Sequence, residues 1–117
     1  MKDAIIFEIL CCKEPFQKID IHERVGLKWI NIWDIFDELE NEEYITKTSN
    51  GYIKGQKIKS LNPKNISDNV DLVKDGEYWV GITECSNVRG KDKYRVARDA
   101  LYKYREMNDQ IIWLHHN

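Results

Sequence analysis

Residues 26–45, GLKWINIWDIFDELENEEYI, contain a glycine turn, one long amphipathic helix and the start of a strand. Apolar residues recur at intervals of three and four, which predicts a helix from about residue 28 to residue 43 with one buried face. The residues of that face are Ile32, Ile35, Phe36 and Leu39. Acidic residues lie on the other side, so a single side of this helix is expected to enter a core.

Two shorter helices are predicted before this one, and a β-hairpin after it. Apolar spacing predicts a helix over residues 3–13, which Pro15 ends, and a second helix over residues 19–25. Gly26 is expected to cap the second helix in the left-handed conformation. Downstream, Asn50-Gly51 separates two stretches rich in Tyr, Ile, Thr and Lys, and this dipeptide predicts a hairpin with a type I′ turn.

The C-terminal half is predicted to form a separate small unit. Residues 61–76 mix Asn, Asp, Ser and Pro with few apolar positions, so they are expected to be a linker or irregular cover. Residues 77–117 contain EYWVGIT, KDKYRVARDALYKYREM and QIIWLHH, which predict a strand, a helix and a strand. The expected fold class is α+β, with three helices and a hairpin in residues 1–60 and a β-α-β unit in residues 77–117.

Composition limits the class of protein. The chain has 117 residues, 42% of them hydrophobic, which is enough apolar material for a core. No run of about 18 apolar residues occurs, and the opening MKDAIIFEILCCKEP lacks a cleavage-like site, so we expect no membrane span and a cytoplasmic location. Cys11, Cys12 and Cys85 are odd in number and are expected to be reduced thiols. A formal charge of −2 gives no global basic surface for nucleic acid.

Catalysis finds no support in the residue pattern. His115 and His116 are adjacent near the end of the chain, and the cysteines are distant from them in sequence, so no metal-ligand spacing is present. Paired carboxylates occur only where the acids end the helix over 28–43, without a histidine or a glycine-rich loop nearby. We therefore expect no enzyme, no catalytic residue, no metal and no cofactor.

Three segments resemble parts of the winged helix-turn-helix family, over residues 3–58. PFQKIDIHERVGL is similar to its second helix and turn, LKWINIWDIFDELENEEYI to its third helix, and TKTSNGYIKGQKI to its wing. The resemblance implies that the third helix lies in the major groove of double-stranded DNA and that the wing contacts phosphate or the minor groove. The positions carried over are Lys28, Trp29, Asn31 and Asp34 on the helix and Lys47, Asn50, Lys54 and Lys57 on the wing.

This chain departs from the family at several positions. Asp34 and Asp37 are poor matches for a groove-reading helix, because carboxylates are repelled by phosphate. His22 stands where the family usually has a small buried residue, and a partly buried histidine is expected there.

Trp29, Ile30 and Trp33 have three interpretations, which the sequence leaves open. They can be core residues that pack under the C-terminal unit, because aromatic side chains supply much buried area. They can form a protein-binding or dimer patch, because Trp is enriched in interface hot spots. They can also contact DNA directly.

The helix over 91–107 has an apolar face and a basic stripe. Tyr94, Val96, Ala97, Ala100, Leu101, Tyr104 and Met107 are expected on the first, and Lys91, Arg95, Arg98, Tyr102 and Arg105 on the second. The stripe can bind phosphate, or it can be a solvated face with ion pairs such as Arg95 with Asp99. RGKDKYRVARDALYKY is also similar to the basic helix start of double-stranded-RNA-binding domains. The strand predicted after this helix does not match that fold.

Two functions follow as expectations. The leading one is a small DNA-binding regulator in which the third helix and wing meet the duplex, with Arg95, Arg98 and Arg105 as further nucleic-acid contacts. The alternative is a protein-interaction module, an accessory or inhibitory factor, that uses Trp29, Ile30 and Trp33. QIIWLHH is apolar on both faces of its predicted strand, so Trp113 is placed at a protein interface and a homodimer is expected.

Overall fold

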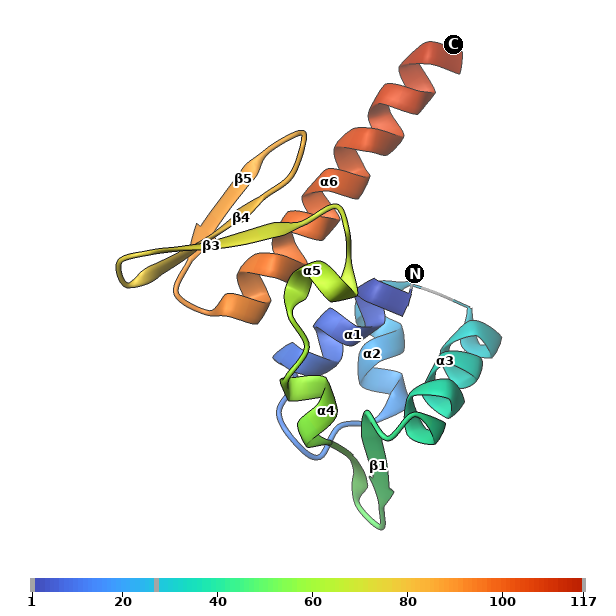
Figure 1. Ribbon diagram of the computed structural model, residues 1–117. Helices are drawn as coiled ribbons and strands as arrows, with labels where there is room; N and C mark the ends of the chain where they lie inside the picture. Colours follow the sequence, from blue (N-terminus) through green and yellow to red (C-terminus); the bar gives the residue numbers. More distant parts are fainter. Residues whose placement is uncertain (1, 27, 117) are drawn as a thin grey trace. The chain divides into compact units, whose positions relative to one another are not determined.

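Helices fill the N-terminal part of the chain, and two small antiparallel sheets and a C-terminal helix follow (Figure 1). The computed structural model describes the backbone of residues 2–26 and 28–116 and the side chains of residues 2–26 and 28–107. Contacts between residues divide the chain into two units, residues 1–61 and residues 62–117. The mixed α+β class expected from the sequence is confirmed.

The first unit begins with three helices close to the predicted ranges: α1 (Lys2–Cys11), α2 (Lys18–Val25) and α3 (Trp29–Asn41). The hairpin strands β1 (Ile45–Thr48) and β2 (Gly51–Lys54) follow, and then the one-turn helix α4 (Gln56–Lys59). Gly26 ends α2 with φ 67° and donates its N–H to the carbonyl of His22 at 3.1 Å, which confirms the left-handed cap. Fully buried side chains in this unit include Phe7, Phe16, Ile21, Ile32, Phe36 and Leu39.

Phe16 ties the hairpin to the segment between α1 and α2. Its N–H donates to the carbonyl of Tyr52 at 3.0 Å, and the N–H of Tyr52 donates back at 2.8 Å. Its ring packs edge-on against Phe36 of α3 and stacks on Tyr52, with centroids 6.2 and 6.0 Å away. Gly51 is required beside this bridge, because a Cβ there would lie 2.8 Å from the carbonyl oxygen of Phe16. Phe16 therefore anchors the hairpin to the helical core by both backbone and ring contacts.

The hairpin is confirmed, but its type I′ turn is wrong. Thr48 pairs with Gly51, so the two turn residues are Ser49 and Asn50 and not Asn50 and Gly51. A type I′ turn needs positive φ at both central residues, and Glu43 alone among the described non-glycine residues has positive φ. The Thr48 hydroxyl stabilises the turn instead, because it accepts the N–H of Asn50 and donates to the carbonyl of Gly51 at 2.7 Å.

The second unit contains α5 (Pro63–Ile66), β3 (Asp71–Asp75), β4 (Tyr78–Ile82), β5 (Asn87–Gly90) and α6 (Lys93–His116). The three strands form one antiparallel sheet in the order β3-β4-β5, and α6 packs along it (Figure 1). Residues 61–76, expected to be a linker or irregular cover, thus contain a short helix and an edge strand. Short turns join the strands, and Gly76 supplies positive φ (61°) after β3.

The predicted β-α-β unit is wrong, because the strands precede the helix and QIIWLHH continues α6 to His116. The physical reason is that the periodicity of a short apolar run does not distinguish a buried strand from a segment of a buried helix. Once α6 has begun, each added residue gains a backbone hydrogen bond without a new nucleation cost. The homodimer was expected because a terminal strand would need a partner, and the structure has no strand at residues 110–116.

Two glycines let α6 approach the sheet closely. A Cβ on Gly81 would lie 2.9 Å from the Cβ of Ala100, and a Cβ on Gly90 would lie 2.9 Å from Cγ2 of Val96. The helix face toward the sheet is buried at Val96, Ala97, Ala100 and Leu101, four of the residues predicted for it. Alternation along the strands places Val73, Tyr78 and Ile82 on the opposite face of the sheet, where all three are exposed.

Candidate interaction surfaces

Four large apolar side chains are exposed on α2 and α3, and we call them the α2–α3 patch. Ile19 is 44% exposed, Trp29 40%, Ile30 66% and Trp33 56%. These fractions show that the two tryptophans are not part of the core of the first unit. Ile19 lies one turn before His22 on α2, and the ring of His22 stacks on Trp29 with centroids 4.1 Å apart and planes 7° apart.

Contacts from α2 hold both tryptophans in place. His22 covers one face of Trp29 and is itself partly buried, as expected from the sequence. The ammonium of Lys18 lies 5.5 Å from the ring centroid of Trp33. An aromatic surface fixed in this way loses little side-chain freedom when a partner binds.

Charges of both signs border the patch along α3. Lys28 is the N-cap residue of the helix, and Asn31, Asp34 and Asp37 are exposed further along it. The groove-reading face implied by the family resemblance therefore presents one lysine and one asparagine beside two carboxylates. Electrostatically this is a poor surface for phosphate, because DNA affinity rests largely on cations.

Two of the four residues predicted for the wing, Lys54 and Lys57, donate hydrogen bonds to backbone carbonyls of the first unit. Lys54 is half-buried, and its ammonium donates to the carbonyls of Leu10 and Cys12 at 3.2 and 2.6 Å, so it caps the end of α1. Lys57 lies in α4 and not on the wing, where it donates to the carbonyl of Glu42 at 3.0 Å. Lys47 and Asn50 are exposed on the hairpin.

A group of cations surrounds two aromatic side chains in the second unit, and we call it the basic–aromatic cluster. Tyr78 and Trp79 are consecutive in β4, so they point to opposite faces of the sheet. Lys74 and Lys93 lie over Trp79 with ammonium groups 5.6 and 5.5 Å from the ring centroid. Arg89 and Lys91 lie over Tyr78 at 4.6 and 5.7 Å.

The cluster joins residues that are distant in sequence. The sheet register pairs Lys74 with Trp79, and Trp79 with Gly90 just before the start of α6. Sequence reasoning included Lys91 in the basic stripe but missed Lys74, Arg89 and Lys93. The signal for them was weak, because it depends on which strand residues face each other.

The arginines predicted to bind nucleic acid are distributed along α6. Arg95 is exposed and lies 3.9 Å from Asp92, next to the cluster. The side chain of Arg98 is only 21% exposed and contacts Asp99 at 3.1 Å, and Arg105 is half-buried. Only Arg95 therefore extends the cluster as an exposed cation. Trp113 lies in α6, but its side chain is outside the part of the chain that is described.

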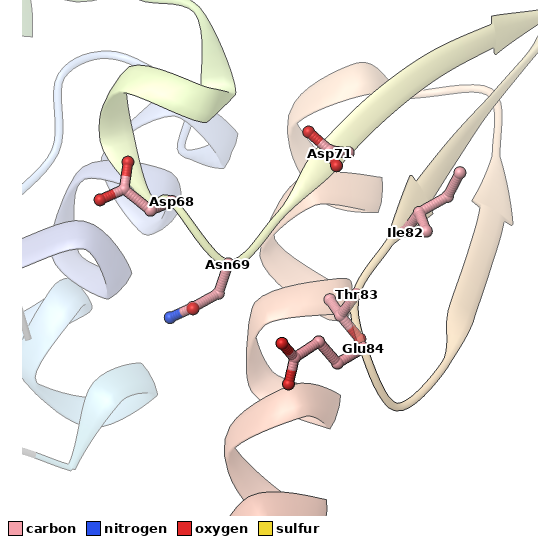
Figure 2. Close-up of a pocket in the computed structure, with 6 residues that line it drawn as sticks. All are labelled: Asp68, Asn69, Asp71, Ile82, Thr83 and Glu84. Atoms are coloured by element: carbon pink, nitrogen blue, oxygen red, sulfur yellow. The ribbon is translucent and has the colours of Figure 1, made fainter.

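A pocket of about 360 Å³ lies at the opposite end of the sheet, between the segment before β3 and the segment after β4 (Figure 2). Its polar lining includes Asp68, Asp71 and Glu84, whose carboxylates lie apart from one another in Figure 2. Asp71 accepts a hydrogen bond from Lys64 at 3.0 Å. Among the described residues, no three His, Cys, Asp or Glu side chains come together as a metal site.

The cysteines are free thiols, as expected. Cys12 is buried, and burial raises the pKa of its thiol above the ordinary value of 9.0, although the guanidinium of Arg24 opposes this effect. Arg24 donates to the sulfur of Cys12 at 3.2 Å and lies 3.7 Å from the buried carboxylate of Glu8. This arrangement stabilises the packing of α1 against α2 rather than activating a nucleophile.

Comparison of the chain with protein-family models, with curated proteins and with solved structures found no match. Over the part of the chain that the structure describes, no helix has the length and apolar character needed to cross a bilayer.

Proposed function

We propose that the protein binds the phosphate backbone of a nucleic-acid duplex through the basic–aromatic cluster of its second unit. The observation that carries the proposal is the placement of cations at one end of the sheet, with Lys74 and Lys93 over Trp79 on one face and Arg89 and Lys91 over Tyr78 on the other. Cations held over aromatic faces keep defined positions, and several of them together supply the electrostatic part of nucleic-acid binding.

The local charge balance favours an anionic partner. Together with Arg95 the cluster has five cations. Of the nearby carboxylates, Asp75 pairs with Arg89 at 2.7 Å, and Asp92 accepts the backbone N–H groups of Tyr94 and Arg95 at the start of α6. The five cations therefore outnumber these two carboxylates at this end of the sheet, although they are divided between its two faces, on a chain whose formal net charge is −2.

The covered aromatic rings favour a duplex over a single strand. Proteins that bind single strands stack unpaired bases on free aromatic faces. Here two cations lie over each ring, so a base would have to displace an ammonium or guanidinium group before stacking. A duplex offers its phosphates without requiring this displacement.

Duplex RNA is the expected preference within this class. The sequence similarity of RGKDKYRVARDALYKY to double-stranded-RNA-binding domains was opposed by a predicted strand after the helix. Since α6 continues through residues 110–116, that opposition is removed. An A-form duplex is recognised mainly through its shape, phosphates and 2′-hydroxyl groups, which suits a surface without base-reading side chains.

The test compares duplex RNA, duplex DNA and single-stranded RNA of about 20 nucleotides by fluorescence anisotropy between about 50 and 200 mM salt. We expect binding to duplexes with a steep loss of affinity on adding salt, and Lys74→Gln with Lys93→Gln should lower the salt slope by about 2. Lys103→Gln, an exposed residue further along α6, is the matched control. Equal binding by the double variant and the wild type would reject the cluster as the contact surface.

DNA reading by α3 is the second candidate. The succession of α1, the Phe16–Tyr52 bridge, α2, α3 and the hairpin supports a winged-helix scaffold. Lys28, Asn31 and Lys47 are exposed in positions that the resemblance assigns to the duplex. Under this candidate Asn31→Ala weakens binding to duplex DNA, whereas Lys74→Gln does not, so the same titrations separate the two surfaces.

A further inference from the structure

An ion pair crosses the basic–aromatic cluster on the face of the sheet that carries Tyr78. Asp75 ends β3 and Arg89 lies in β5, so the two residues belong to the two outer strands of the sheet. Their side chains nevertheless meet, because Nη1 of Arg89 donates to Oδ2 of Asp75 at 2.7 Å. The register places Asp75 opposite Tyr78, and the guanidinium of Arg89 lies 4.6 Å from the centroid of that ring. The pair therefore spans the central strand β4 at Tyr78.

Asp75 offers Arg89 the same chemistry as a backbone phosphate. A guanidinium binds carboxylate and phosphate oxygens with the same planar set of N–H donors. The carboxylate therefore competes with a phosphate for Arg89, and it also repels an approaching phosphate. The side chain of Arg89 is 54% exposed and that of Asp75 is 61% exposed, so a ligand can reach both. An ion pair this exposed is weak, which allows one anion to replace the other.

The cations on the opposite face of the sheet are held differently. Lys74 and Lys93 lie over the ring of Trp79. An aromatic face attracts a cation without neutralising its charge. Asp75, in contrast, compensates the charge of Arg89. The two faces of the cluster are therefore unequal, since one presents charged lysines and the other an arginine that is paired within the sheet.

We propose that Asp75 is an internal competitor of the phosphate backbone, so that Arg89 contacts a duplex only in exchange for this carboxylate. The inference rests on the proposed function and concerns the regulation of the same cluster. In the free protein Arg89 pairs with Asp75. In the complex it pairs with phosphate, and the carboxylate of Asp75 is released to solvent. The exchange lowers the affinity for the duplex and reduces the number of phosphates that the wild type neutralises.

Fluorescence anisotropy with the duplexes described above tests the exchange. Asp75→Asn keeps the size of the side chain and removes its charge. In about 100 mM salt it should raise the affinity about three- to tenfold and steepen the salt slope by about 1, the signature of one further phosphate contact.

Asp71→Asn is the matched control. Asp71 lies at the other end of β3, where it pairs with Lys64 at 3.0 Å, so its substitution removes an equal charge and an equal kind of pair. Asp71 and Asp75 are about 13 Å apart along the strand, which exceeds the screening length of about 10 Å at this salt concentration. The control should therefore change the affinity by about twofold at most.

A double variant separates the loss of the pair from the loss of a negative charge in general. If Asp75 acts through Arg89, Arg89→Gln should cancel the gain of Asp75→Asn, and the double variant should bind as Arg89→Gln alone does. A gain that persists in the double variant overturns the exchange, and so does wild-type affinity in Asp75→Asn. Circular dichroism that matches the wild type shows that each variant is folded.

The proposed function is judged separately by Lys74→Gln with Lys93→Gln. Weaker binding by that variant, together with no gain from Asp75→Asn, leaves the cluster as the contact surface and overturns the competitor alone. Absence of duplex binding by both the wild type and Asp75→Asn rejects the proposed function and the competitor together.

Discussion

The Cα of Gly81 lies so close to Ala100 that no side chain fits between them: a Cβ on Gly81 would be 2.9 Å from the Cβ of Ala100 and 3.1 Å from the carbonyl of Val96. Because one of these neighbours is helix backbone, the strain cannot be relieved by rotating a side chain. Gly81→Ala is expected to lower the free energy of unfolding by about 1–3 kcal/mol, the usual cost of overpacking.

Urea denaturation followed by circular dichroism measures this effect. Ala100→Gly in the same chain removes the shortest of these contacts, so the double variant should lose less stability than the sum of the single losses. Additive losses would mean that Gly81 and Ala100 are not coupled through this contact.

Lys54 and Lys47 occupy the same hairpin but should differ in their effect on stability. Lys54→Met removes a charged donor from the carbonyls of Leu10 and Cys12, with an expected loss of about 1.5–3 kcal/mol. Lys47→Met changes an exposed side chain and should stay within about 0.5 kcal/mol of the wild type. Thermal unfolding of the two variants gives the comparison, and similar losses for both would contradict the capping role of Lys54.

Cys12 should be the slowest of the three thiols to react. Burial raises the pKa of its thiol, and only the thiolate reacts with alkylating reagents. Iodoacetamide labelling at about pH 8, read by peptide mass spectrometry, should modify Cys85 at least about tenfold faster than Cys12. Denaturant should remove the difference, and equal rates in the folded protein would contradict the burial of Cys12.

Lys2 and Glu38 form a hydrogen-bonded ion pair at 2.7 Å between α1 and α3. The hydrogen bond and charge of Lys2 lower the pKa of Glu38 below 4.5, and Glu38 raises the pKa of Lys2 above 10.5. The stabilisation from Glu38 is complete above its ordinary pKa and is lost as the pH falls through its lowered value. The stabilisation from Lys2 is complete below its ordinary pKa and is lost as the pH rises through its raised value.

The pair therefore contributes fully between about pH 5 and pH 10. Lys2→Met should move the titration midpoint of the Glu38 side chain upward, measured by carbon-detected NMR between pH 2 and pH 7. Lys13→Met, on the segment after α1, should leave the midpoint of Glu38 unchanged. A midpoint insensitive to Lys2→Met would show that the pair does not form in solution.

Local patterns in the sequence were sufficient to predict most helices and strands of the first unit. Ile32, Phe36 and Leu39 of α3 are buried as their spacing predicts, Ile35 of the same predicted face is only partly buried, and Gly26 adopts the left-handed cap. Helices, caps and hairpins depend on hydrogen bonds between residues that are close along the chain, so the residues that determine them are visible together. The strand predicted for the apolar run at residues 110–116 is wrong, because the periodicity of a short run fits a strand and a helix equally well. In the structure the run continues α6.

The candidate surfaces depended on partners that no local pattern reveals. The lysines predicted for the wing looked equivalent in sequence. In the structure, however, Lys54 donates to carbonyls at the end of α1, 42 and 44 residues earlier in the chain. The register of β3 against β4 brings Lys74 to Trp79, and the turn into α6 brings Lys93 to the same ring. Sequence by itself determined the three helices and the hairpin of the first unit and the apolar faces that build them, since backbone hydrogen bonding acts over a few residues. Only the tertiary structure decided which lysines and arginines bond to groups within the protein and which are exposed to a partner, because these bonds join segments that are distant in sequence.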